Sequence, residues 1–292
     1  MKTKLIVLLG VIGVSFSAIF VKYATAPSTV LAFYRMGFTT LCLLPVVLFK
    51  HQEELKSLTR KNILWCMISG FFLACHFTCY FESIRYTSVS SSTVLVDTEV
   101  FFICILSYVL FREKCSRSGL LGIAITFGGS VVLAMADRSG GSAIIKGDSL
   151  ALMGACFMAI YTMIGSRQRK GLSTTVYTFF VYGTTSLTLF IFNLITKTPV
   201  YGYGGMNYLW GFLLCLFCTL MGHSIFNWGL KYLPTALISN MKLGEPVFAS
   251  ILALFLFGQV PGIQQIIGGL LVILGIYIYL KNANNIPQEE NN

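Results

Sequence analysis

The 292-residue chain is 55% hydrophobic and only 11% charged, whereas about 25% of the residues in an average soluble domain are charged. Its formal net charge is +10, but the Lys and Arg residues are dispersed in short gaps between apolar runs. This composition excludes a soluble globular domain, and the dispersed charge indicates basic loops against anionic membrane lipid rather than a nucleic-acid partner.

Apolar stretches of about 20 residues follow one another along the chain. They do not alternate apolar and polar residues as barrel strands do, and a bilayer requires backbone hydrogen bonds within the spanning segment, so helices are predicted. The segments between them are too short for a soluble domain and carry charges, Pro and Gly. We predict an all-α, polytopic membrane protein with ten transmembrane helices, centred near Ile12, Phe38, Phe72, Ile103, Phe127, Phe157, Leu187, Leu216, Ala249 and Leu271.

The distribution of basic residues predicts the orientation. With the N-terminus in the cytoplasm, fourteen Lys and Arg residues lie in inner loops and only five lie in outer loops. The positive-inside rule therefore predicts that both termini lie in the cytoplasm. The five outer residues are Lys22, Arg85, Arg138, Lys146 and Lys197.

The first apolar run has an alternative interpretation as a signal peptide. Lys2, Lys4, the run itself and the small residues Ala24-Thr25-Ala26 match the order of a signal peptide and its cleavage site. The run is long for a signal peptide and ends in Lys22, which favours a first transmembrane helix.

The chain also carries a weak internal repeat. An offset of 146 residues aligns Arg85-Tyr86 with Lys231-Tyr232 and Glu99 with Glu245, and it also aligns Gly122 with Gly268 and Gly129 with Gly275. Since each unit holds five spans, the second unit enters the membrane from the opposite side. We predict two inverted units, at residues 1–137 and 147–281, followed by a polar cytoplasmic tail at 282–292; inverted repeats recur in secondary transporters.

Several motifs resemble the EamA-type proteins of the drug/metabolite transporter superfamily. The first unit carries Tyr86-Thr87-Ser88, Ser90-Ser91-Ser92, Glu113-Lys114, Leu121-Gly122 and Gly128-Gly129. The second unit carries Tyr232-Leu233-Pro234-Thr235-Ala236, Glu245-Pro246-Val247-Phe248, Gly258, Gly268, Gly269 and Gly275. The resemblance covers almost the whole chain.

This resemblance implies a ten-helix bundle whose central cavity is lined chiefly by the first four helices of each unit. The fifth helices would then serve packing or contacts within a homodimer. It also implies movement of amino acids, related metabolites or cationic drugs across the cytoplasmic membrane, often outward. The sequence departs from the pattern at Val100, where proline is common, which predicts an unbroken fourth helix, and at Gln259, where an acidic residue is common.

Charged residues within the spans are the first candidates for a substrate site, because each costs about 2.5 to 3.5 kcal/mol on insertion scales. Arg35 and Asp97 lie at similar depths and are predicted to pair. Lys242 and Glu245 are three residues apart on one helix face, and Pro246 is expected to bend that helix. Glu99 matches Glu245 in the repeat. Each pair could instead be a purely structural ion pair.

Polar and aromatic residues extend this candidate site. His76 shares a helix face with Tyr80, and His223 shares one with Asn227. A histidine in a span can titrate near neutral pH, or it can simply bond a neighbouring carbonyl. The amide of Asn240 and the rings of Tyr34, Tyr80 and Tyr161 complete the predicted cavity wall, which suits amino acids and amines.

These features favour a secondary transporter that moves a small metabolite by alternating access, and the mixed charges suit an amino acid or a related zwitterion or amine. The resemblance implies that the movement is outward. Protons are the candidate coupling ion, through Asp97, Glu99 or Glu245. No cofactor is predicted, since the sequence has no P-loop and its scattered cysteines form no metal-ligand pattern.

Three alternatives remain open at this point. The chain could import a larger metabolite with the same fold. It could be an intramembrane enzyme, although neither His-Glu-x-x-His nor Gly-x-Ser-x-Gly occurs in it. It could also be a membrane scaffold without transport, which has less reason to keep charges within its spans.

Overall fold

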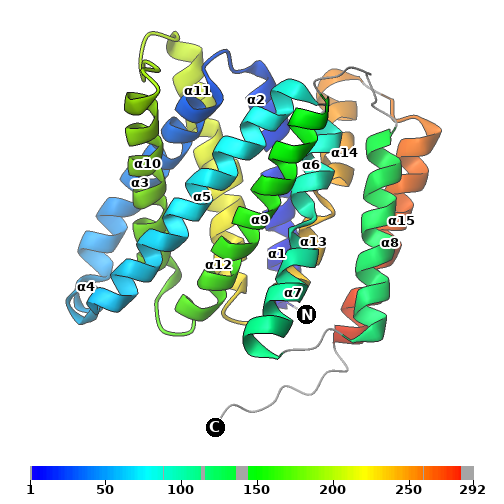
Figure 1. Ribbon diagram of the computed structural model, residues 1–292, viewed down its shortest axis with the longest axis horizontal. Coiled ribbons are helices and arrows are strands. Elements are labelled where there is room, and N and C mark those ends of the chain that lie inside the picture. The colour runs from blue at the N-terminus through cyan, green and yellow to red at the C-terminus, as the bar shows by residue number, and fades with distance from the viewer. Residues whose placement is uncertain (1, 88, 113–115, 136–143, 259, 284–292) are drawn as a thin grey trace.

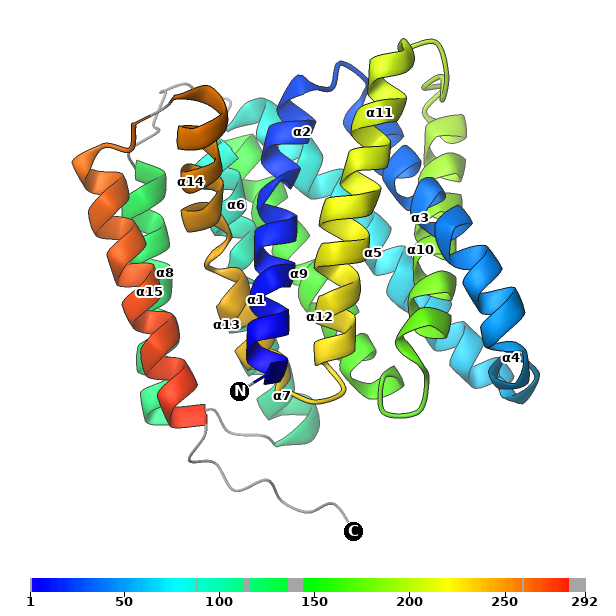
Figure 2. The same ribbon diagram turned by 180° about the vertical axis from the view of Figure 1, so that it is seen from behind.

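The computed structural model describes residues 2–87, 89–112, 116–135, 144–258 and 260–283 (Figures 1 and 2). All regular secondary structure in these residues is helical, and every predicted span centre lies in a helix. Nine described helical segments are long and apolar enough to cross a membrane, and Arg117–Val132 is a shorter apolar helix. The chain is thus an all-α polytopic membrane protein, as predicted. The predicted features outside the described residues are Ser88, Glu113, Lys114, Arg138, Gln259 and the tail beyond residue 283.

The helices of the first half are α1 (Lys2–Ser15), α2 (Ser17–Tyr23), α3 (Ser28–Lys50), α4 (Gln52–Ser57), α5 (Arg60–Tyr86), α6 (Val89–Asp97), α7 (Glu99–Phe111) and α8 (Arg117–Met135). Those of the second half are α9 (Ile144–Gln168), α10 (Thr174–Ile195), α11 (Gly205–Leu213), the π-helix η1 (Leu214–His223), α12 (Ser224–Gly229), α13 (Thr235–Lys242), α14 (Glu245–Phe257) and α15 (Ile263–Ala283). Some spans are made of consecutive shorter helices, such as α6 with α7.

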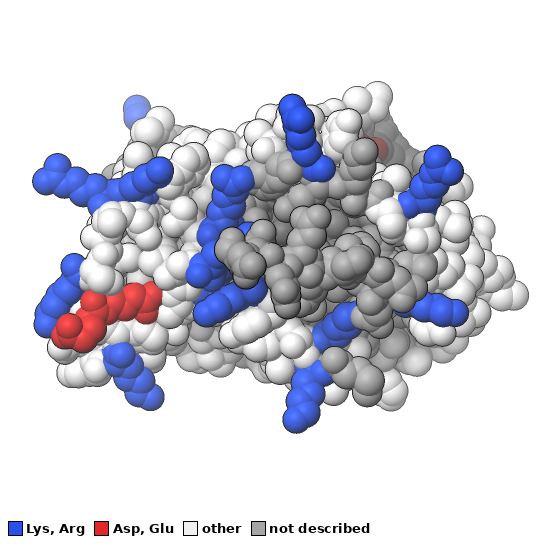
Figure 3. All heavy atoms as spheres, turned by 90° about the horizontal axis from the view of Figure 1, so that it is seen from below, with Lys and Arg blue, Asp and Glu red and all other residues white. Residues whose placement is uncertain are grey.

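The first helices of the two halves run in opposite directions. In Figure 1, α1 rises from the lower face of the bundle, whereas α9 descends from its upper face. The helix α1 begins, and α15 ends, at the same face, which we call the lower face. Seen from below, Lys and Arg side chains are spread over the described parts of this face, while acidic side chains gather mainly at one edge (Figure 3).

The contacts between helices are arranged alike in the two halves. The second spans pack on each other as α3 with α10, and the fifth spans pack as α8 with α15. The third span of the first half, α5, packs on the first span of the second half, α9; α1 packs in the same way on η1. Exchanging the two halves therefore leaves this pattern of pairs unchanged.

Glycines allow the close approach of α8 and α15. A Cβ on Gly275 would lie 2.3 Å from the hydroxyl oxygen of Thr126, and one on Gly129 would lie 2.7 Å from the carbonyl oxygen of Gly268. Small residues of this kind let membrane helices pack backbone to backbone. The glycines that align the two repeats thus form the interface between their fifth helices.

We expect Gly275→Ala to destabilise the bundle by about 1 to 3 kcal/mol, because the added methyl group overpacks this interface. Thermal unfolding of the purified protein in detergent measures the effect. Gly128→Ala on α8 is the matched control, since a Cβ there meets no atom within 4 Å. Equal melting temperatures for the two variants would contradict this packing.

The fourth spans are interrupted at matching positions. In the first half Thr98 separates α6 from α7, and its N–H bonds the carbonyl of Leu95 at 3.2 Å. In the second half the N–H of Gly244 bonds the carbonyl of Met241 at 3.1 Å. These residues are 146 positions apart, and both bonds are the tighter i to i−3 type.

The prediction of an unbroken fourth helix was therefore wrong. Val100 has no proline ring to break the helix, but the Thr98 hydroxyl donates to the carbonyl of Leu95 at 2.6 Å and supports the same turn. Near Pro246, where a bend was predicted, the helix is interrupted, since α13 ends at Lys242 and α14 begins at Glu245.

The loops of the lower face also connect the two halves. The Glu54 carboxylate accepts a bond of 2.6 Å from the N–H of Ser173, the N-cap of α10, and lies 3.0 Å from Nδ1 of His51. Burial works to raise the pKa of Glu54, but the hydrogen bonds from Ser173 and His51 outweigh it and hold the pKa below its ordinary value. The short helix α4 is thereby fixed to the start of α10.

Candidate functional site

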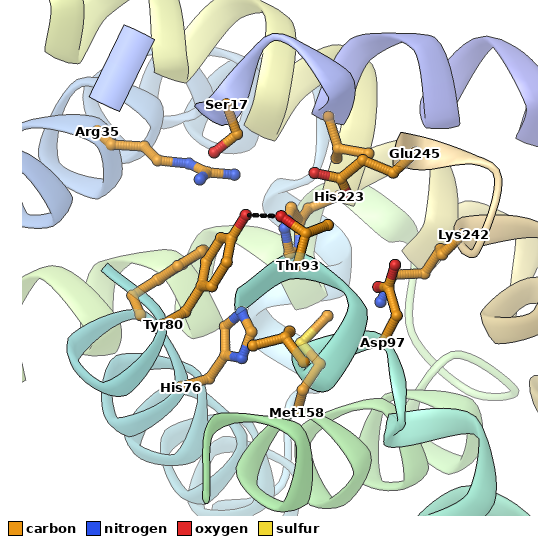
Figure 4. A pocket seen from close by; sticks show the side chains of 13 residues that line it. Ser17, Arg35, His76, Tyr80, Thr93, Asp97, Met158, His223, Lys242 and Glu245 are labelled. Atoms are coloured by element: carbon orange, nitrogen blue, oxygen red, sulfur yellow. Dashed lines mark hydrogen bonds between the residues drawn. The ribbon is translucent and has the colours of Figure 1, made fainter. Parts of the chain in front are cut away.

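A polar cavity of about 40 Å³ lies where the interrupted helices meet the other spans. Both halves line it (Figure 4). Its walls are Val14, Ser17, Arg35, His76, Phe77, Tyr80, Thr93, Val96 and Asp97 from the first half and Met158, His223, Lys242 and Glu245 from the second. Ligand sites usually measure about 300 to 1,000 Å³, so in this conformation the cavity is too small for a metabolite.

An ion pair beside the cavity joins the two halves. Nζ of Lys242, the last residue of α13, lies 2.5 Å from Oε1 of Glu99, the first residue of α7. Their side chains are 8% and 1% exposed. Lys242 therefore pairs with Glu99 and not with Glu245 as predicted, because the interruption at Gly244 separates Lys242 and Glu245 onto different helices.

The buried guanidinium of Arg35 is held by a hydroxyl and a ring. Its Nε donates to the hydroxyl of Thr219 in η1 at 2.7 Å, and its central carbon lies 4.5 Å from the centre of the Phe77 ring. Among the described residues Arg35 forms no ion pair with Asp97, so that predicted pair is absent. Both nonetheless line the same cavity.

The π-helix provides the hydroxyl that holds Arg35. The hydroxyl of Thr219 also donates to the carbonyl of Leu214, five residues earlier, at 3.3 Å. That spacing follows the wider turn of η1 and directs the threonine oxygen toward α3. Helices of this type are rare and are frequently found at functional sites.

Two histidines and a tyrosine form the aromatic part of the wall. Nδ1 of His76 donates to the carbonyl of Gly154 at 3.0 Å, and its ring stacks on Tyr80 with centroids 5.9 Å apart. The Tyr80 hydroxyl lies 3.1 Å from that of Thr93, as the dashed line in Figure 4 marks. The rings of His223 and Phe77 pack edge to face, with their centroids 5.6 Å apart.

Four buried polar atoms at this site have no hydrogen-bond partner among the described residues. They are Nη2 of Arg35, Oδ2 of Asp97, Oε2 of Glu99 and Nδ1 of His223. All four side chains belong to residues that are at most 6% exposed. An unsatisfied buried polar group costs about 1 to 3 kcal/mol, and more when it is charged, so the arrangement is poised to bind a polar partner.

The chain matches one transporter family twice, once in each half. The EamA-like transporter family covers residues 1–135 and again residues 145–281. The chain belongs to the EamA-like transporter family. A Clostridium kluyveri protein named an uncharacterized transporter is 23% identical to it over 72% of this chain and 70% of its own length.

Another relative and a solved structure agree with this membership. The Bacillus subtilis protein named uncharacterized transporter YetK is 25% identical over 84% of this chain and 77% of its own length. A crystal structure with 16% identity superposes on 97% of this chain and 99% of its own with a TM-score of 0.77, which establishes the likeness of fold. The family and the names of its relatives point to a membrane transporter and not to an enzyme.

In this EamA-like transporter, seven of the twelve predicted site residues line the cavity, and Glu99 joins them through Lys242. The other four lie elsewhere. The Tyr34 hydroxyl donates to the carbonyl of Val200 at 2.6 Å, in the loop between α10 and α11, and the Tyr34 ring packs on that of Tyr208, so Tyr34 does not line the cavity. Asn240 is fully buried away from the cavity lining, and neither its side-chain nitrogen nor its oxygen has a partner among the described residues.

Asn227 and Tyr161 form a hydrogen-bonded layer beside the cavity. Nδ2 of Asn227 donates to the Tyr161 hydroxyl at 2.6 Å, to the Tyr182 hydroxyl at 3.3 Å and to the carbonyl of His223 at 2.9 Å. The carbonyl of Asn227 accepts from Nε of the buried Arg169 at 2.9 Å. This layer links α9, α10 and α12 of the transporter on the side of the cavity toward the lower face.

Several residues of the transporter site were not predicted from the sequence. Thr93 lies one helical turn before Asp97, so a search for polar residues beside the intramembrane charges would have found it. Phe77, Met158 and Ser17 carry no such signal, because apolar and small residues within a span look like ordinary packing residues.

Proposed function

We propose that this transporter carries an amino acid, or a related zwitterion or amine, outward across the cytoplasmic membrane by alternating access. One observation carries the substrate class. The donor Nη2 of Arg35 and the acceptor Oδ2 of Asp97 are both buried, neither has a hydrogen-bond partner among the described residues, and both residues line one cavity. A zwitterion would satisfy them together, its carboxylate bound to Arg35 and its ammonium bound to Asp97.

Alternating access is supported by the way the two halves meet. Their first helices run in opposite directions, and their fourth spans are interrupted at positions 146 residues apart. The set of helix–helix contacts also stays the same when the two halves are exchanged. In inverted-repeat transporters the substrate binds between the repeats, at interrupted helices. Because the cavity measures only about 40 Å³, the halves must separate on one side before a substrate enters.

Proton coupling is supported by the charge count at the cavity. Among the described residues at the cavity, the carboxyls of Asp97, Glu99 and Glu245 face two permanent cations, Arg35 and Lys242. With every group ionised the cluster carries one excess negative charge, which uptake of one proton neutralises. The other titratable groups around it are His76 and Tyr80 on α5 and His223 on η1.

The basic lower face supports the predicted orientation. Lys and Arg side chains are spread over the described parts of this face and are more common there than acidic ones, and α1 begins and α15 ends at it (Figures 1 and 3). A cytoplasmic lower face agrees with the positive-inside rule. The homodimer implied by the family resemblance stays a prediction.

The test is flux through the purified full chain in proteoliposomes. We expect saturable, protein-dependent movement of amino acids or amines. Protons should move in the opposite direction to the substrate, so the pH inside the vesicles should change as the substrate moves. Zwitterions, organic cations and neutral sugars are compared in one screen. Saturable flux restricted to neutral sugars, or the absence of flux for every compound, would reject the proposal. Uptake in place of export would support the importer alternative.

A further inference from the structure

A second and larger hollow lies on the lower half of the bundle, outside the central site. It measures about 740 Å³ and runs between α5, α7 and α9. Its walls toward the bilayer centre are apolar and include Phe72, Leu106 and Ile160. Trp65 and Leu110, which line it nearer the lower face, are 39% and 58% exposed. We call this hollow the α5–α9 groove.

The α5–α9 groove is polar at one end only. Lys61 and Asn62 lie at the start of α5, and Arg167 and Gln168 lie at the end of α9, so all four are at the lower-face end of the groove. None of the described residues that line it is acidic. The chain thus places two cations and two amides at the lower-face end of the otherwise apolar α5–α9 groove.

The length of the groove matches one leaflet. Eleven residues of α5 separate Lys61 from Phe72, which is about 16 Å along a helix. Half of a hydrocarbon core of about 30 Å is about 15 Å. With Lys61 and Arg167 at the level of the lipid headgroups, Phe72 therefore reaches the middle of the bilayer.

We propose that the α5–α9 groove binds one anionic phospholipid of the leaflet at the lower face. Its phosphate is bound by Lys61 and Arg167, and one of its acyl chains lies along Trp65, Ile68 and Phe72. Basic pockets between transmembrane helices bind anionic headgroups in this way. The groove is separate from the central cavity, so this inference does not depend on the proposed substrate.

The experiment is native mass spectrometry of the full chain, released from detergent and titrated with phosphatidylglycerol or phosphatidylcholine. We expect one phosphatidylglycerol to bind at least tenfold more tightly than phosphatidylcholine. The double variant Lys61→Gln/Arg167→Gln should lose this preference. The control is Arg117→Gln/Lys231→Gln, which removes two exposed cations that do not line the groove and should keep it.

A third variant separates a groove from a merely basic surface. Ile164→Trp fills the apolar wall and leaves both cations in place, so it should also weaken phosphatidylglycerol binding. Unchanged binding in this variant or in the groove double variant would overturn the proposal, as would equal affinity for the two lipids. Displacement of the lipid by millimolar inorganic phosphate would instead identify a site for free phosphate and would also overturn it. Retained thermal unfolding shows that each variant is folded.

Discussion

Replacing Lys242 with methionine is expected to destabilise the protein by about 3 to 5 kcal/mol, because it leaves a buried carboxylate at Glu99 without its cation. The two side chains are 8% and 1% exposed and lie 2.5 Å apart, on helices from opposite halves. Chemical or thermal unfolding of Lys242→Met in detergent measures the loss.

The double variant Lys242→Met/Glu99→Leu distinguishes a structural ion pair from one used in transport. Removing both charges avoids the buried unpaired carboxylate, so we expect stability within about 1 kcal/mol of the native protein. If the pair takes part in the transport cycle, flux stays lost in this stable variant. Native flux with regained stability would assign the pair a structural role, and additive single effects would show that the two groups do not interact.

Much of the fold was predictable because a bilayer leaves few choices. A run of about 20 apolar residues must form a helix there, and each predicted centre is helical. The repeat offset of 146 residues aligned Glu99 with Glu245, and each of these residues begins the second part of an interrupted span. The interruption at Thr98 itself was missed, because no proline marks it in the sequence.

Pairing between helices was not predictable from depth alone. Arg35 and Asp97 were matched by their distance from the helix ends, which fixes height but not the direction of the side chain around each helix. Arg35 instead reaches Thr219, 184 residues later in the chain. Only the packing of α3 against η1 determines that contact.

Helical rotation explains which neighbours of a site residue miss the cavity. Successive helical residues point about 100° apart, so Tyr34 cannot share the direction of Arg35 and contacts Tyr208 instead. Asn240 is two residues from Lys242, so a rotation of about 200° places its side chain on nearly the opposite side of the helix. The sequence identified the polar residues of each span but could not determine which face the cavity would use.

Removing either charge of the proposed zwitterion site is expected to lower kcat/KM for the transported amino acid about 30-fold or more. Truncating one partner of a buried, hydrogen-bonded charge pair costs about 2 to 5 kcal/mol, and about 2 kcal/mol is a factor of about 30. Asp97→Asn and Arg35→Gln are the variants, measured by flux in proteoliposomes. Tyr34→Phe is the control, since its hydroxyl bonds a carbonyl outside the cavity, and it should leave the transport rate unchanged.

Substrate analogues assign the two ends of the substrate to the two residues. If Arg35 binds the carboxylate, Arg35→Gln should reduce transport of the amino acid but change that of the matching amine without a carboxylate by less than about threefold. Asp97→Asn should reduce transport of both, because each keeps the ammonium group. The reverse pattern would exchange the two assignments. A residue that contacts only the carboxylate cannot affect transport of a substrate that lacks one. Equal losses of transport for every substrate in Arg35→Gln would therefore show that the guanidinium acts on the fold or on the conformational change.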